Sequence, residues 1–99
     1  MTVLATFNPS YGTGQIVSPG ATSAAVSIGA GEKTVCLTNL ADVICYVRVG
    51  GSAVVATTAD YPVPPGGQVT ITKGQDSNYL AHIAPAGGGS LHVMTGEGF

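Results

Sequence analysis

The sequence predicts an all-β protein, an antiparallel β-sandwich of jelly-roll type with about eight short strands. Turn residues, mainly Gly, Pro and Asn, recur about every ten positions along the chain. Between the turns, apolar residues alternate with small polar ones, as in a strand with one buried face. Ala, Val and Thr carry much of the composition, and no segment has the periodicity of a three-turn helix.

The length of 99 residues suits one domain, because two smaller cores would each need disulfides or metals for stability. We therefore expect a single β-sandwich domain over residues 1–99. Residues 1–20 are expected to form either an extended N-terminal arm or a strand of the core.

Each strand is predicted from its alternation and from the turn residues that bound it. The alternation is clearest where small residues separate Ala24, Val26 and Ile28, and where a threonine separates Val69 from Ile71. The expected strands are, in order, 2–7, 15–17 (the weakest), 22–28, 33–38, 43–49, 53–57, 68–72, 79–84 and 90–95.

The fourth and fifth expected strands are close in sequence, and we expect them to pair as a hairpin. A register with residue 35 opposite 45 and 37 opposite 43 keeps the apolar side chains on one face and sets Glu32 opposite Arg48. A shift by one residue would place Lys33 opposite Arg48, and like charges directly across a sheet are unfavourable. The preferred register keeps Cys36 and Cys45 apart, so both are expected to be free, buried thiols.

The last two expected strands are joined by residues 85–89, and we expect them to form a second hairpin. Pairing Ile83 with Leu91 places both, with Val93, on the buried face and sets His82 opposite His92 on the other face. Two facing imidazoles can hold a metal ion. Because the sequence fixes no third ligand, we expect two exposed histidines, with no metal site and no cofactor.

Charge and hydropathy exclude several classes of partner. Only 8% of the residues are charged, against about 25% in an average soluble domain. Three basic residues cannot follow a phosphate backbone, so no nucleic acid is expected as a partner. The longest apolar runs, such as residues 53–56, are far too short to span a membrane. The opening residues lack the pattern of a secretory signal, so we expect an unprocessed chain made in a cytoplasm.

No motif supports an enzyme. Residues 29–34 (GAGEKT) look like part of a phosphate loop, but Glu32 separates Gly31 from Lys33 and a strand follows. A Gly-x-Ser-x-Gly nucleophile elbow does not occur in the sequence. Nothing selects a catalytic pair among the acidic residues, which fall in or beside predicted turns: Glu32, Asp42, Asp60, Asp76 and Glu97.

Residues 60–67 (DYPVPPGG) form the most distinctive segment. Its three prolines fix φ and its Pro-Gly pair suits a tight turn, so the segment is predicted to be a rigid, extended connector. A preordered segment loses little entropy on docking, so it serves either as a binding segment or as a plain connector over its own domain. The four tyrosines and two phenylalanines are scattered, which favours packing over a sugar-binding platform.

Several stretches within residues 33–98 follow one another in a recognisable order: an Asn-ended strand, a YVRxG strand, an Ala-Thr-Thr-x-Asp-x-Pro connector and a Gly-Glu-Gly tail. They read VCLTN (35–39), CYVRVG (45–50), ATTADYPVPPG (56–66), HIA (82–84) and LHVMTGEG (91–98). In this order and content the chain resembles small β-rich proteins that tailed bacteriophages and prophages encode beside the major capsid gene.

The resemblance implies a non-enzymatic virion protein on the capsid surface, made in the host bacterial cytoplasm. Its expected role is that of a decoration or cement protein that stabilises the phage head by binding the major capsid protein. A surface with few charges is poorly suited to a free monomer, so we also expect a homodimer or homotrimer. The expected interface residues are Tyr61, Pro62, Val63 and Pro64 in the connector and Glu97, Gly98 and Phe99 in the tail.

Two other functions stay open at this point. One is a head-tail joining or tail structural component of the same virion. The other belongs to a different class, a carbohydrate-binding module, and is favoured only by the four tyrosines and the sandwich.

Overall fold

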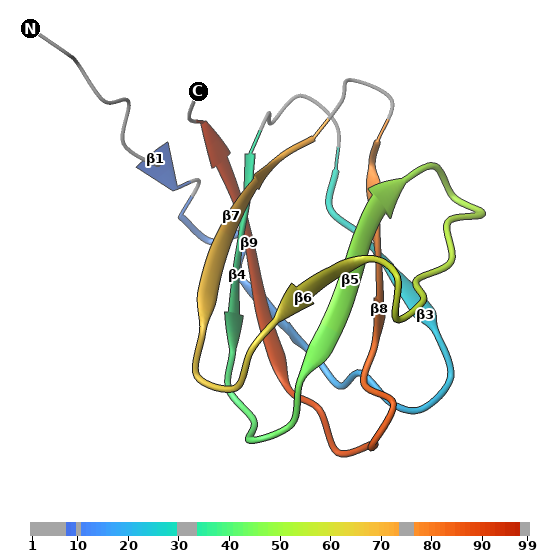
Figure 1. The fold of residues 1–99 in the computed structure, drawn as a ribbon. Coiled ribbons are helices and arrows are strands. Elements are labelled where there is room, and N and C mark those ends of the chain that lie inside the picture. Colours follow the sequence, from blue (N-terminus) through green and yellow to red (C-terminus); the bar gives the residue numbers. More distant parts are fainter. Residues whose placement is uncertain (1–7, 10, 30–33, 74–76, 98–99) are drawn as a thin grey trace, which may run out of the picture.

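The computed structural model describes residues 8–9, 11–29, 34–73 and 77–97 (Figure 1). These residues form nine strands, and none of them lies in a helix. The strands are β1 (Asn8–Pro9), β2 (Gln15–Val17), β3 (Ala24–Ser27), β4 (Thr34–Asn39), β5 (Cys45–Gly50), β6 (Tyr61–Val63), β7 (Gln68–Thr72), β8 (Tyr79–Ile83) and β9 (Leu91–Glu97).

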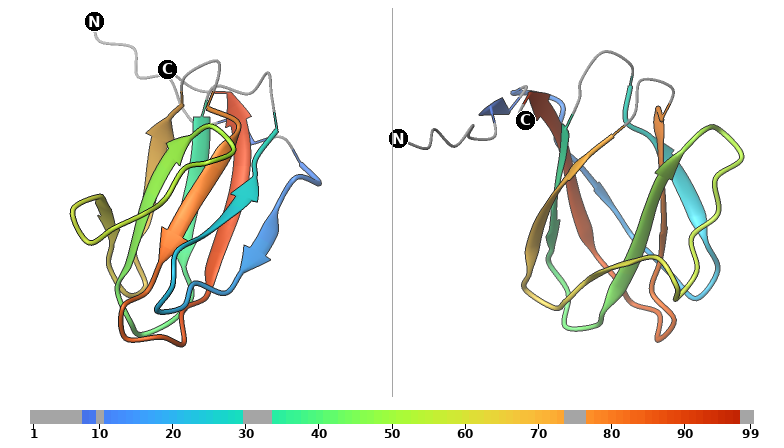
Figure 2. Two further views of the ribbon diagram at one scale, coloured as in Figure 1. Left: turned by 90° about the vertical axis from the view of Figure 1, so that its right-hand side faces the viewer. Right: turned by 45° about the horizontal axis from the view of Figure 1, so that its top comes forward.

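The strands form two antiparallel sheets, which lie as separate layers (Figure 2). Sheet A has the order β1-β9-β4-β7, with β2 also paired to β9, and sheet B has the order β3-β8-β5-β6. The strand pairs nest inside one another: β5 with β6, β4 with β7, β3 with β8 and β2 with β9. This nesting across two sheets is the jelly-roll arrangement, so the predicted fold class is confirmed.

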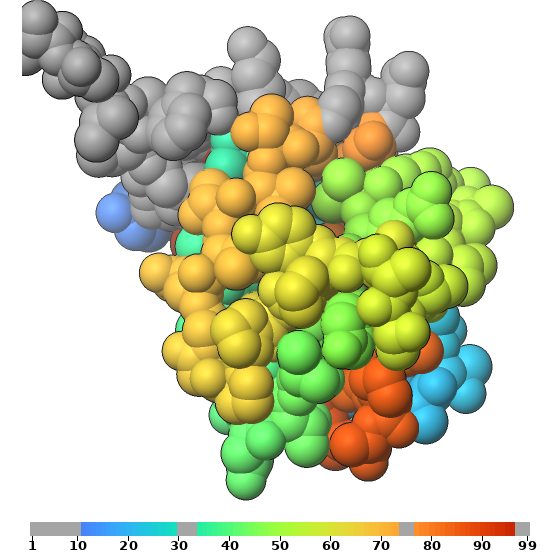
Figure 3. Space-filling model, in the orientation of Figure 1, coloured from blue at the N-terminus to red at the C-terminus, as the bar shows by residue number. Residues whose placement is uncertain are grey.

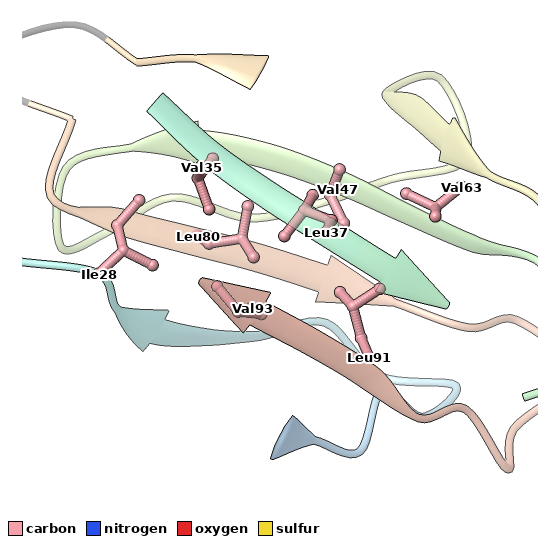
Figure 4. Close-up of a cluster of buried hydrophobic side chains, with 8 residues drawn as sticks. All are labelled: Ile28, Val35, Leu37, Val47, Val63, Leu80, Leu91 and Val93. Atoms are coloured by element: carbon pink, nitrogen blue, oxygen red, sulfur yellow. The ribbon is translucent and has the colours of Figure 1, made fainter. Parts of the chain in front are cut away.

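The hydrophobic core lies between the two sheets (Figure 4). Every second residue of a strand faces inward, so Val35 and Leu37 of β4 meet Val47 of β5 and Leu80 of β8. None of these four side chains is more than 1% exposed. The full cluster is Ile28, Val35, Leu37, Val47, Val63, Leu80, Leu91 and Val93.

The predicted central hairpin is wrong, because β4 and β5 lie in different sheets. Val35 is opposite Ile71 on one side and Thr95 on the other, while Cys45 is opposite Val63. The connection between the two strands crosses from sheet A to sheet B instead of turning within one sheet. Both strands still bury the predicted apolar face, because they face each other across the sandwich.

The predicted C-terminal hairpin is also wrong, since β8 belongs to sheet B and β9 to sheet A. Ile83 is opposite Tyr46 and only partly buried. Leu80 and His82 are the buried residues of β8 that alternate inward. Leu91 is fully buried, as predicted, but it packs against the facing sheet rather than beside Ile83.

Residues 53–57, predicted as a strand, are part of the β5–β6 loop (51–60) instead. The amide of Ala56 donates a 2.9 Å hydrogen bond to Ser23 Oγ, just before β3, so the loop reaches over β8 to the far edge of sheet B. Ala81 of β8 lies opposite Arg48 of β5 and, like Arg48, points to the outer face of sheet B, yet Ala81 is fully buried. The apolar run of residues 53–56 therefore lies over the outer face of sheet B.

The predicted strand at 2–7 lies outside the described residues.

Candidate functional site

The predicted interface segment coincides with β6, an edge strand of sheet B, and with the turn that follows it. Tyr61 is 52% exposed, and Pro62 and Pro64 are also exposed. Val63 is completely buried and belongs to the core, so its prediction as a contact residue is wrong; the inward alternation of β6 points it away from any partner. Glu97 ends β9 without a described side chain, and Gly98 and Phe99 lie outside the described residues.

The connector ends in the tight turn that the Pro-Gly pair predicts. The amide of Gly67 donates to the carbonyl of Pro64 at 2.8 Å, and Gly66 has a φ of 70°. A positive φ at the third position of such a turn requires glycine, while proline before it fixes the second position. Pro62 removes a backbone donor from the exposed strand edge, which disfavours uncontrolled strand pairing there.

Asp60 fixes the start of the connector. Its Oδ2 accepts a 2.7 Å hydrogen bond from the amide of Thr57, and its own amide donates to the Thr57 carbonyl at 3.0 Å. Its Oδ1 lies 4.0 Å from Nη1 of Arg48 in β5. Arg48 therefore contacts the connector. Glu32, the residue predicted to lie opposite Arg48, lies outside the described residues.

Asn39, at the end of β4, holds the other end of the connector. Its Nδ2 donates to the carbonyl of Val43 at 2.8 Å and to that of Val63 at 3.0 Å. Its Oδ1 accepts from the amide of Ala41 at 3.0 Å, and the residue is 1% exposed. Asn39, Arg48 and Asp60 come from three of the stretches that carry the phage resemblance. These residues act together to hold one connector in place.

One end of the sandwich is formed by four connections that carry almost no charge. They are the β2–β3 (18–23), β4–β5 (40–44), β6–β7 (64–67) and β8–β9 (84–90) connections, and Asp42 is their only charged residue. We call this surface the apolar end; it is the lower end in Figure 1. Leu40 is 54% and Ile44 37% exposed there, beside the exposed residues Pro64, Pro65, Pro85 and Ala86.

Backbone hydrogen bonds join the four connections of the apolar end. The β8–β9 connection is bonded to its neighbours by Gly89 N–H to Pro19 O at 3.0 Å, Ala84 N–H to Gly20 O at 2.8 Å and Leu40 N–H to Ser90 O at 2.8 Å. The amide of Asn39 donates to Gly67 O at 2.9 Å. The apolar end is thus preordered, and a preordered surface loses less entropy on binding.

A hollow of about 420 Å³ lies at the opposite end, where β5 passes into the β5–β6 loop. It is lined by residues 48–51 and 53–55, and Val55 is 57% exposed at it. The Arg48 side chain is 60% exposed. Among the described residues, Arg48 is the exposed cation, because Lys73 is buried. The lining contains no carboxylate, imidazole or thiol, so it holds no acid–base pair.

The two histidines do not face each other, contrary to the sequence prediction. His82 points into the core from β8, opposite Val47, and is only 4% exposed. Its Nδ1 has no hydrogen-bond partner, and burial lowers the pKa of the imidazole, which favours the neutral form. His92 lies in the other sheet, opposite Ile16 and Thr38. Within the described part of the chain, no three His, Cys, Asp or Glu side chains gather as metal ligands.

Both cysteines are free, as predicted. Cys45 is completely buried on the inward side of β5, and burial raises the pKa of its thiol. Cys36 was also predicted to be buried, but it is only partly buried, because alternation with Val35 and Leu37 turns it to the outer face of sheet A.

The four tyrosines do not form one platform. Tyr11, 86% exposed, precedes β2 in sheet A, whereas Tyr61 lies on the edge strand of sheet B. Tyr46 and Tyr79 are partly buried, on neighbouring strands of sheet B, opposite Ile83 and Gly50 respectively.

Comparisons with known proteins give a likeness of fold. No protein-family model and no curated protein matches the chain. A solved structure of Bacillus endospore appendages, described as a novel family of disulfide-linked pili, is similar with a TM-score of 0.51 at 10% sequence identity. The likeness covers 95% of this chain and 89% of that one. Among the described residues there is no helix long and apolar enough to cross a membrane.

Sequence reasoning missed the apolar end and the hollow. A signal for the apolar end does exist: Leu40 and Ile44 stand in the connection after Asn39, where polar turn residues are usual. The hollow has no such signal, because the sequence of residues 53–57 predicts a strand and not a loop that covers the sheet.

Proposed function

We propose that the protein is a non-enzymatic structural protein of a tailed-phage virion, which decorates the capsid surface by binding the major capsid protein. The observation that carries this proposal is the joint role of Asn39, Arg48 and Asp60. These residues belong to separate stretches of the phage resemblance, and they hold a single exposed connector. The stretches that carry the resemblance therefore meet around one exposed surface of this protein, and that supports the proposal.

The properties of that surface support docking on a repeated lattice. Tyr61, Pro62 and Pro64 form a preordered, exposed segment at an edge strand. Val63, in the same segment, packs into the core and fixes its position. Aromatic side chains on a rigid backbone are common anchors of protein interfaces. Many identical contacts of modest size are sufficient for a cement protein, because the lattice repeats them.

Co-sedimentation of the purified protein with capsids that lack it tests the proposal. We expect saturable binding, and we expect Tyr61→Ala to weaken it by about tenfold or more, as for an interface anchor. Tyr11→Ala is the matched control, because Tyr11 is exposed but lies before β2 in the other sheet, and it should bind like the wild type. Protein that stays in the supernatant at every concentration would contradict the proposal.

The likeness to the endospore appendages supports a second candidate, a subunit of a self-assembling filament outside any virion. Electron microscopy of the concentrated protein separates the two candidates. Filaments without capsid binding would favour the second, whereas capsid binding would favour the first.

A further inference from the structure

We propose that copies of this protein associate head to tail, with the apolar end of one copy seated in the hollow of the next. The contact would join Leu40, Asp42 and Ile44 of one subunit to residues 48–55 of its neighbour. This inference goes beyond capsid decoration, because it needs no capsid, and for the filament candidate it names the surfaces through which subunits would join.

The two surfaces lie at opposite ends of the same strand. β5 begins beside the β4–β5 connection and ends at the hollow, so the two surfaces point in opposite directions along the sandwich. In Figure 3 the β4–β5 connection forms the lowest point of the molecule, and the β5–β6 loop protrudes at the upper right. Such a contact joins different surfaces on the two partners, which produces a ring or an open chain of subunits.

The two surfaces are chemically complementary. The projecting apolar end offers two exposed aliphatic side chains, Leu40 and Ile44. The lining of the hollow is more polar than apolar, because it includes Arg48 and the backbone at residues 50–51, and its apolar part comes from Ala53, Val54 and Val55. Val54 already packs on the backbone at Gly50, where an added Cβ would lie 2.9 Å from its Cγ2, so the floor of the hollow is fixed. Burial of exposed apolar groups is the driving force that favours association.

The charges match as well. Asp42 is the only charge of the apolar end, and Arg48 is the only charge that lines the hollow. The intramolecular partner of Arg48, Asp60, lies 4.0 Å away, which leaves donors of the guanidinium for a second carboxylate. Charge also argues against the main alternative, a two-fold pairing of two apolar ends, because it would bring two Asp42 side chains together without a cation.

Charge reversal provides the sharpest test. In Asp42→Arg both ends are positive, and in Arg48→Asp both are negative, so each variant alone should associate at least about tenfold more weakly than the wild type. A mixture of the two variants restores opposite charges at every contact and should associate again. Sedimentation velocity from about 5 to 500 µM measures the mass distribution, at concentrations where weak self-association becomes visible.

Matched substitutions separate this contact from a general surface effect. Leu40→Ser and Ile44→Ser should weaken association. Ile16→Ser should not, because Ile16 is 64% exposed but lies on β2 of sheet A, outside both proposed contact surfaces. A wild type that stays monomeric over the whole range would overturn the proposal. So would an Arg48→Asp variant that associates as the wild type does, because that result means that the contact does not use the hollow. Capsid binding is compared in Asp42→Arg, because Asp42 has no part in holding the connector, whereas Arg48→Asp would also remove the contact with Asp60. Capsid binding by a monomeric Asp42→Arg variant would leave the proposed function standing, so the two proposals fail separately.

Discussion

Replacing Asn39 by alanine tests the role of the residue that holds the connector. The substitution removes two hydrogen bonds donated by Nδ2, to Val43 O at 2.8 Å and Val63 O at 3.0 Å, and one accepted by Oδ1 from Ala41 N at 3.0 Å. The bond to Val63 is buried, and a buried acceptor left unpaired costs about 1–3 kcal/mol. The other two bonds are partly buried, so water can replace them in part, at about 0.5–1 kcal/mol each.

The free energy of unfolding of Asn39→Ala should therefore fall by about 2–5 kcal/mol, a large share of the stability of a small domain. Urea unfolding followed by far-ultraviolet circular dichroism and tyrosine fluorescence measures it, since the chain has no tryptophan. Asn78→Ala is the matched control, because the Oδ1 of Asn78 is buried without a partner and little should be lost with it. A loss below about 1 kcal/mol for Asn39→Ala, or one equal to the control, would refute this reasoning.

Three further predictions concern buried groups. The lowered pKa of His82 means that the unfolded chain binds the proton more readily; stability should therefore decline as pH falls below 6.5 and level off below the folded-state pKa. The urea midpoint, measured as a function of pH, should lose this decline in His82→Gln. A His82→Gln variant with the same pH profile as the wild type would contradict the prediction. Iodoacetamide should modify Cys36 in the folded protein but Cys45 only after unfolding, because Cys45 is buried with a raised pKa; mass spectrometry finding equal labelling would argue otherwise. Val63→Ala should lower the free energy of unfolding by about 2 kcal/mol through two lost methyl groups and a cavity, while Tyr61→Ala should leave it within about 0.5 kcal/mol. Equal losses in thermal unfolding would show that β6 does not divide into a buried and an exposed side.

The strands were predictable because alternation records which residues face the core. Residues 15–17 and 68–72 coincide with β2 and β7, and the apolar faces of β4, β5 and β9 are buried as predicted. Alternation does not record which strand lies beside which. The connections of five to seven residues after β4 and β8 fit a hairpin as well as a crossing to the other sheet, so both predicted hairpins were wrong.

The candidate site was predictable only in part. The prolines of residues 60–67 do mark an ordered, exposed segment. Proline argues against a strand in the middle of a sheet, so the sequence predicts a connector there. An edge strand tolerates proline, however, and β6 is such a strand. The same strand character buries Val63 between two exposed prolines. The apolar end depends on four connections that are distant in sequence and meet only once the jelly roll has formed. No local pattern contains that information.

Cryo-electron microscopy of capsids, first emptied of the protein and then saturated with it, tests whether the protein decorates the capsid shell. We expect jelly-roll-shaped density at positions that repeat over the whole shell, with β6 and Tyr61 against the major capsid protein. Density confined to the portal vertex or the tail would contradict capsid decoration in favour of a joining or tail component. A shell without added density would contradict a virion role based on capsid binding altogether.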